Sequence, residues 1–236
     1  IQVFRPEVID NYNQIFSRDI GFVIEDKFIS ANILPERDQE ITAIHHVLNQ
    51  IPKENRISLP EECHVEGGDV MPWNNYIFIG TYSRKDYSEY ITARTNVNAV
   101  RAIQELFPNK IVKSFELRKS NDNAKENALH LDCCFQPIGK NMAILHKNGF
   151  LIEEEFEWLK NYFGRENIFE ISKDEMYQMN SNVFSISEDI VISEQNFTRL
   201  NLWLERKGFT VEKVPYSEIA KQEGLLRCST LPLVRD

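Results

Sequence analysis

The chain has 236 residues, 42% of them hydrophobic and 27% charged, a balance that supports a sizeable core and excludes a disordered protein. Acidic residues give a formal net charge of -9, and no run of Lys or Arg forms the basic stripe that nucleic-acid binding needs. No apolar run approaches the roughly 18 residues of a membrane span, and the four cysteines lack CxxC spacing, so we expect a cytoplasmic protein that binds neither nucleic acid nor membrane.

Four segments follow one plan, in which two short apolar strands separated by a polar break lead into an amphipathic helix. They are "DIGFVIEDKFISANI", "GGDVMPWNNYIFIGTY", "LHLDCCFQPIGKNMAILHK" and "SNVFSISEDIVISE". Apolar residues three or four positions apart predict the helices. Their stripes are, in chain order, Ile41, Ile44, Leu48 and Ile51 in a helix from about Glu36; Val97, Val100, Ile103 and Phe107 near Asn96; Ile152, Phe156, Leu159 and Phe163, closed by Gly164; and Phe197, Leu200 and Leu204, closed by Gly208.

A further strand follows each of the last three helices, in "NKIVKSFEL", "ENIFEIS" and "FTVEKVP". The unit is therefore strand, strand, helix, strand, and its recurrence at roughly 50 to 60 residues indicates repeated modules within one fold. The final "GLLRCSTLPLV" begins a fifth unit, which could close only with the N-terminal end of the chain. We predict one α/β domain over residues 1–236, built as a closed ring of modules.

Polar motifs stand at equivalent places in these units. "SRD" contains Asp19, "VEGGD" contains Glu66, "HLD" contains His130 and Asp132, and "RCST" contains Cys228. Equivalent strand ends of a ring would bring these side chains together at one mouth.

Such a group of residues suits chemistry on a guanidinium. Several carboxylates at one site repel each other unless a cation joins them, and a guanidinium is a planar fork of N–H donors that two or three carboxylates can hold. A cysteine thiolate could then attack the guanidinium carbon, while His130 acts first as general acid to the departing amine and later as base toward water. Because the substrate itself carries the positive charge, we expect no metal and no cofactor.

In these motifs the chain resembles the guanidino-group modifying enzymes of the pentein fold, which include arginine deiminase, dimethylarginine dimethylaminohydrolase and the amidinotransferases. The resemblance covers nearly the whole chain, with the motifs in the same order. It implies an α/β propeller of five modules around a central site, which matches the repeat. It also implies catalytic roles for Cys228, His130 and Glu66, and substrate-binding roles for Asp19, Asp132, Arg94 in "ARTN" and Arg37 in "PERDQE".

The reaction that the resemblance implies is hydrolysis of a guanidino or ureido group in a small arginine-like substrate, through a covalent thiouronium on Cys228. Two alternatives stay open: an amidinotransferase, in which an acceptor amine replaces water, and a non-catalytic pentein that only binds. The "HxD" pattern of His130 and Asp132 resembles the deiminases and amidinotransferases, whereas dimethylarginine hydrolases tend to lack the second acid. A homodimer is also an open expectation.

The chain departs from the family pattern at two places. The family usually begins with a strand and a helix upstream of Ile1, and "YSRKDYSEY" adds residues between "EGGD" and "ARTN", where we expect a loop near the mouth. Three simpler structural roles compete with the catalytic interpretation. Cys228 could be a buried structural thiol. Cys133 and Cys134 are expected along a core strand, and Asp69 is expected to cap the turn made by the two glycines.

Overall fold

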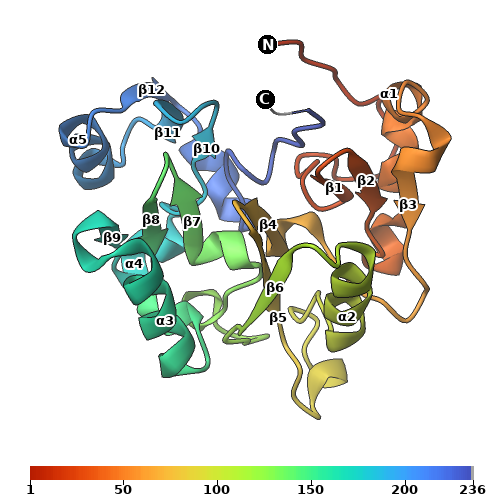
Figure 1. Ribbon diagram of the computed structural model, residues 1–236. Helices are drawn as coiled ribbons and strands as arrows, with labels where there is room; N and C mark the ends of the chain where they lie inside the picture. The colour runs from red at the N-terminus through yellow and green to blue at the C-terminus, as the bar shows by residue number, and fades with distance from the viewer. Residues whose placement is uncertain (235–236) are drawn as a thin grey trace.

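The computed structural model describes residues 1–234 and places four three-stranded sheets around a common centre, with the longer helices on the outside (Figure 1). The strands within these residues are β1 (Gly21–Ile24), β2 (Lys27–Ser30) and β3 (Arg56–Ser58); β4 (Val70–Trp73), β5 (Tyr76–Thr81) and β6 (Ile111–Glu116); β7 (Phe135–Ile138), β8 (Met142–Leu145) and β9 (Ile168–Glu170); and β10 (Phe184–Ser185), β11 (Ile190–Glu194) and β12 (Thr210–Val214).

Each sheet has the same topology. Its first two strands form an antiparallel hairpin, and its third strand lies parallel to the second, as β6 lies beside β5 with Tyr76 opposite Ile111. A parallel neighbour requires a crossover connection, and in all four sheets the crossover contains helix. The predicted order of strand, strand, helix, strand is therefore confirmed.

The α-helices are α1 (His45–Leu48), α2 (Val97–Leu106), α3 (Glu153–Phe163), α4 (Lys173–Tyr177) and α5 (Thr198–Arg206). The predicted stripes explain the burial of α2, α3 and α5, since Ile103, Phe156 and Leu200 are at most 1% exposed. Asn96 caps α2 by accepting a hydrogen bond from the backbone N–H of Ala99. Gly164 and Gly208, which follow α3 and α5, have φ of 82° and 92°, where glycine is favoured.

The first module differs from its prediction in two respects. The segment expected to be an α-helix from about Glu36 is a 3-10 helix over Pro35–Ile44 that continues into the short α1. Its inner side chains still pack as predicted, with Ile44 and Leu48 buried. A third strand, β3, follows this helix, although we had expected such a strand only in the other three modules.

The core lies mainly between neighbouring modules, because each sheet packs its apolar side chains against the next. One cluster joins the second and third modules through Phe78 and Phe135, and another joins the third and fourth through Ile144 and Leu200. Full burial of one such side chain contributes about 2 kcal/mol, so modules that share a cluster stabilise each other.

The C-terminal segment contacts the first module, although no strand pairing among the described residues closes the ring there. The backbone N–H of Arg18 donates to the carbonyl of Cys228 at 2.9 Å, and Leu231 packs against the cluster that contains Ile20 and Phe28. The N-terminal segment and the end of the described chain lie on the same side of the ring in Figure 1. The described part of the fifth module contains no three-stranded sheet of its own.

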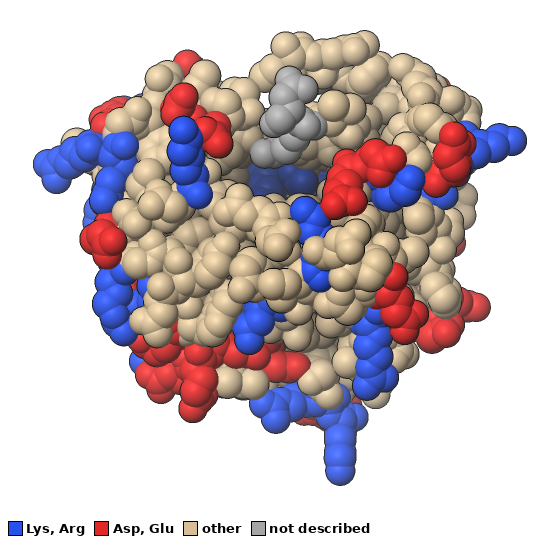
Figure 2. Space-filling model, viewed as in Figure 1, with Lys and Arg blue, Asp and Glu red and all other residues tan. Residues whose placement is uncertain are grey.

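The surface carries charges of both signs, and Figure 2 shows a hollow near the centre of the viewed face with basic side chains inside it. Within residues 1–234, no helix combines the length and the apolar character needed to cross a bilayer.

Candidate active site

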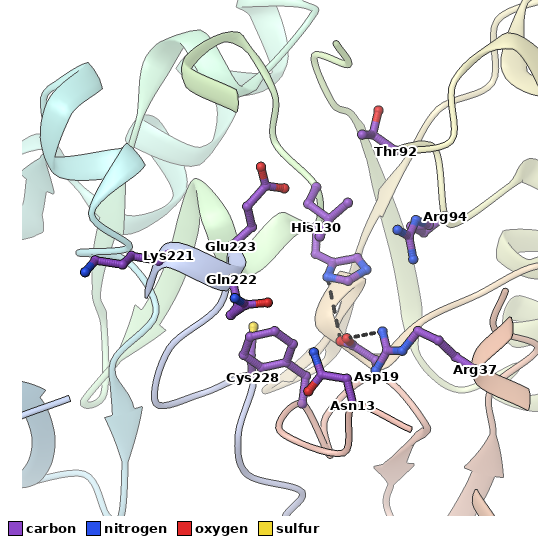
Figure 3. A pocket seen from close by; sticks show the side chains of 12 residues that line it. Asn13, Asp19, Arg37, Thr92, Arg94, His130, Lys221, Gln222, Glu223 and Cys228 are labelled. Carbon is purple, nitrogen blue, oxygen red and sulfur yellow. Dashed lines mark hydrogen bonds and ion pairs between the residues drawn. The ribbon is translucent and has the colours of Figure 1, made fainter. Parts of the chain in front are cut away.

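A cavity of about 410 Å³ opens at the centre of the ring, where the modules meet (Figure 3). Five of the seven predicted site residues line it: Asp19, Arg37, Arg94, His130 and Cys228. The other residues of its wall are Asn13, Phe16, Thr92, Leu129, Lys221, Gln222 and Glu223.

Cys228 reaches the cavity from the segment that follows the 3-10 helix Ser217–Gln222. Glu223 ends that helix with a φ of 62°, and this left-handed residue turns the chain so that the next residues run toward the ring centre. Cys228 is 2% exposed, and the backbone bond to Arg18 fixes it against the first module.

His130 and Glu66 form a buried pair beside the cavity. Nε2 of His130 lies 2.7 Å from Oε2 of Glu66, and each residue is 1% exposed. Nδ1 of His130 lies 3.7 Å from Oδ1 of Asp19, so the ring stands between two carboxylates. Burial alone would lower the pKa of His130, but the charge of Asp19 and the hydrogen bond to Glu66 raise it to about 9. The imidazole is therefore a cation at neutral pH.

The two carboxylates respond differently to burial. Burial alone would raise the pKa of Glu66, yet the hydrogen bond and charge of His130 outweigh it and lower the pKa to about 2. Burial raises the pKa of Asp19 to about 6, and the charges of His130 and Arg37 only partly oppose it. Oδ1 of Asp19 accepts no hydrogen bond from the described residues.

The predicted arginines pair with the predicted acids. Nη1 of Arg37 donates to Oδ2 of Asp19 at 2.9 Å, and Nη1 of Arg94 donates to Oε1 of Glu66 at the same distance. Glu40 holds Arg37 from the other side, through hydrogen bonds from both Nε and Nη2. Both arginines remain in the cavity wall, 19% and 13% exposed in their side chains.

Asp132 lies behind Cys228 and does not line the cavity. It is fully buried, its Oδ2 accepts from Nη1 of Arg227 at 2.6 Å, and Sγ of Cys228 lies 3.4 Å from the same oxygen. Burial raises the pKa of the Cys228 thiol well above its usual range, and the charge of Asp132 adds to this effect. At neutral pH Cys228 is therefore a thiol at rest.

The turn made by Gly67 and Gly68 requires glycine at position 68, because the His130 ring approaches it closely. A Cβ atom on Gly68 would lie 2.6 Å from Nδ1 of His130, a distance that no side chain permits. We expected Asp69 only to cap this turn, but it does more. Its Oδ1 accepts from the backbone N–H of Leu131 at 2.8 Å and its Oδ2 from Oγ1 of Thr95 at 2.6 Å, so it ties the turn to the segments that carry His130 and Arg94.

Asp19, Glu66 and His130 each offer one ligand atom within 4.8 Å of the others, a spacing that a metal ion could use. However, Nε2 of His130 is already paired with Glu66, and Arg37 and Arg94 bring two positive charges to the same carboxylates. This arrangement suits the carboxylates to planar cations more than to a metal ion.

The expectation for Cys133 and Cys134 was wrong in its detail. Cys133 ends a 3-10 helix (Leu131–Cys133) and Cys134 directly precedes β7, so both lie in the turn before the strand. They are buried, and burial raises the pKa of each thiol.

Two polar residues that contact Cys228 or Asp132 were not predicted from the sequence. They are Asn182, whose side chain touches Sγ of Cys228, and Arg227, which holds Asp132. The "RC" dipeptide could have suggested Arg227, whereas "SNVFS" gave no signal for Asn182.

Comparison with known sequences points to guanidine chemistry. The chain is 29% identical over 225 residues to YkgA, an uncharacterised protein of Bacillus subtilis, covering 94% of this chain and 70% of YkgA. It is 27% identical over 223 residues to the arginine deiminase of Mycoplasma capricolum, covering 81% of this chain. The chain spans only about half, 52%, of that deiminase.

Solved structures share the fold. The N-terminal domain of ArgZ, a cyanobacterial arginine dihydrolase bound to product, superposes with a TM-score of 0.76 at 19% identity, covering 93% of this chain and 75% of that one. A dimethylarginine dimethylaminohydrolase from Pseudomonas aeruginosa, complexed with citrulline, gives 0.74 at 19% identity, covering 92% and 75%. The predicted pentein fold is thus confirmed. The family model described as N,N dimethylarginine dimethylhydrolase, eukaryotic, matches residues 1–235, and the chain belongs to that family of guanidino-modifying penteins.

Proposed function

We propose that the protein hydrolyses the terminal guanidino group of an arginine-like amino acid, with Cys228 as nucleophile. The observation that carries the proposal is the meeting of Cys228, the protonated His130, Asp19 and two arginines in one cavity. A thiol, a general acid and a carboxylate are what attack on a guanidinium carbon requires.

Binding would exchange ion pairs. In the resting site Arg37 occupies Asp19 and Arg94 occupies Glu66. A substrate guanidinium that pairs with Asp19 would release Arg37, and the freed arginines would then hold the α-carboxylate of the same substrate by charge-assisted hydrogen bonds. The bound cation also lies beside the sulfur, where it lowers the pKa of Cys228 and favours the thiolate.

In the first half-reaction, the Cys228 thiol loses its proton to solvent, the thiolate sulfur forms a C–S bond to the guanidinium carbon, and one C=N electron pair moves onto nitrogen. His130 then donates its proton to the departing nitrogen, the C–N bond breaks and ammonia leaves. A planar thiouronium remains covalently attached to Cys228.

In the second half-reaction, the neutral His130 takes a proton from water, and the water oxygen attacks the same carbon. The C–S bond breaks, its electron pair returns to the sulfur of Cys228, and the hydroxyl proton passes to that sulfur, so that a neutral ureido product is released and the resting thiol is restored. Glu66 keeps the His130 ring oriented in both steps through its hydrogen bond.

The proposal ranks arginine above its N-methylated derivatives. Asp19 lines the cavity and its Oδ1 accepts no hydrogen bond from the described residues, so this carboxylate favours a substrate nitrogen that still carries N–H donors. A methylated nitrogen would present carbon to that carboxylate and leave it less satisfied.

The test is to incubate the protein with arginine, agmatine and methylated arginines in water, and to follow ammonia, alkylamines and ureido products together with intact-protein mass. We expect turnover of arginine, poor turnover of agmatine because it lacks the carboxylate, and loss of all turnover in Cys228→Ser. Cys63→Ser is the matched control, because Cys63 is also buried but does not line the cavity.

The other outcomes separate the alternatives. Faster turnover of methylated arginines would reverse the substrate ranking and keep the mechanism. Reaction only after addition of an acceptor amine would replace hydrolysis by amidino transfer. Binding of arginine without a product or an adduct would replace the enzyme by a binding module.

A further inference from the structure

Asn182 lies against Cys228 in a part of the chain to which neither motif nor mechanism assigns a role. It follows α4 in the turn before β10, is fully buried, and directs its side chain to the nucleophile. Its Nδ2 lies 3.1 Å from Sγ of Cys228.

Hydrogen bonds determine which end of the Asn182 amide faces the sulfur. The backbone N–H groups of Leu225 and Cys228 each point at Oδ1 from 3.0 Å. Backbone N–H groups can only donate, so the atom that faces them must be the amide oxygen. The amide nitrogen, with its two N–H donors, is therefore the atom that faces the sulfur, and the carbonyl of Asp132 lies 3.4 Å from it.

The thiol proton has a different partner. Sγ of Cys228 donates toward Oδ2 of Asp132 at 3.4 Å, which leaves the sulfur lone pairs to accept from Asn182. Once the proton is lost, the contact from Asn182 becomes a hydrogen bond to an anion, about twice as strong as a neutral one.

We propose that Asn182 is a catalytic residue that donates a hydrogen bond to the thiolate of Cys228 and holds the sulfur in line with the cavity. This role rests on the proposed function, in which Cys228 is the nucleophile. The other titratable or charged groups that face Cys228 are Asp132, Asp19 and Cys133, which disfavour the thiolate, and Arg227, which favours it, with His130 in the same cavity wall.

The proposal predicts a change in thiol acidity when the donor is removed. We would measure the rate of iodoacetamide alkylation of Cys228 against pH, by peptide mass, in the wild type and in Asn182→Ala. Loss of one hydrogen bond to an anion should raise the apparent pKa of Cys228 by about one unit, or about tenfold less thiolate at a fixed pH. Thermal melts would confirm that the variant is folded.

Two further variants make the result specific. Asn182→Ser is the second test. The serine side chain is one bond shorter and does not reach the sulfur, but its hydroxyl keeps a polar group near the two backbone donors. Asn180→Ala is the matched control, since Asn180 is a buried asparagine of the same turn and has no hydrogen bond to Cys228. The pKa should rise in both Asn182 variants and stay unchanged in the control.

An unchanged thiol pKa in folded Asn182→Ala or Asn182→Ser would overturn the proposal and leave Asn182 a purely structural residue. Alkylation needs no turnover, so this result is independent of the substrate assay. Arginine hydrolysis without the pKa shift would remove only the role of Asn182. The shift without any hydrolysis would remove the proposed function and keep the contact to the thiolate.

Discussion

The two sides of the cavity differ in how their charges are balanced. On the His130 side, Glu66, Asp19 and the two arginines form a continuous network, and the imidazole is protonated at rest with a pKa of about 9. On the Cys228 side, burial and Asp132 hold the sulfur in its neutral form. In the proposed mechanism, the acid is therefore ready before the substrate arrives, whereas the nucleophile is not.

In the proposed mechanism, this difference means that the substrate completes the site. A cation between the two sides would replace Arg37 at Asp19 and at the same time stabilise the thiolate. A neutral ligand would do neither, so selection for a guanidinium follows from electrostatics as well as from shape.

The largest expected effect comes from the thiol side. Cys228→Ser should lower turnover of arginine by roughly 10⁴-fold or more, because a serine hydroxyl in this site has no base to ionise it. Intact-protein mass should show no covalent adduct in this variant. Residual turnover near the wild-type rate would mean that the His130 side acts alone on a water molecule.

On the other side, Glu66→Gln keeps the shape of the side chain but removes the charge that stabilises protonated His130. The pKa of His130 should fall, and kcat should drop by about 10²-fold, within the range of general acid–base catalysis. Glu116→Gln is the control, because Glu116 is a mostly buried carboxylate that binds Ser83 and does not line the cavity. Equal losses in both variants would point to destabilisation instead.

The pH profile compares the two sides directly. The resting enzyme at neutral pH has a protonated His130 and a neutral thiol, while the reactive form has one proton fewer. Consequently kcat/KM should rise about tenfold per pH unit toward a limit near 9, where His130 loses its proton. The pH at which kcat stops rising should be lower than the corresponding pH for kcat/KM, because the bound substrate cation already favours the thiolate. A flat kcat/KM through neutral pH would show that the thiol is ionised at rest.

The smallest expected effect is on stability. The pKa of Asp19 is raised in the folded state from 3.8 to about 6, so the stability that its protonated carboxyl contributes is lost as the pH rises through that value. Asp19→Asn should therefore stabilise the protein at neutral pH, by on the order of 2 kcal/mol, while it impairs binding of arginine. Urea unfolding at several pH values would test this, and the gain should vanish near pH 4, where both side chains are neutral.

Much of the ring could be predicted from apolar spacing, since Ile103, Phe156 and Leu200 mark helices that the structure contains. The segment after Pro35 became a 3-10 helix instead. Its sequence "PERDQEITAI" mixes charged residues with β-branched Ile and Thr, which are weaker α-helix formers. Its buried side chains could be predicted, but its helix type could not.

The cavity could be predicted in part, because strand ends of repeated modules must converge. The sequence could not show in which direction each side chain points or which arginine pairs with which acid. The side chain of Asp132 lies behind Cys228, where it pairs with Arg227. Arg37 and Arg94 pair with the acids of the resting site. The role of Asn182 could not be predicted from the sequence. An asparagine before a strand is typical of any turn, and only the contact with Cys228 distinguishes this one.

The hydrogen bond from Arg18 to Cys228 joins residues that lie near opposite ends of the described chain, and a second bond runs from Nε of Arg18 to the carbonyl of Arg227. Contacts between such distant positions form late in folding, because the intervening chain must first be ordered. During synthesis, Cys228 leaves the ribosome after all four sheets have been made. We therefore expect the nascent chain to have no aligned nucleophile, so that reactivity at Cys228 appears only once the whole ring has formed.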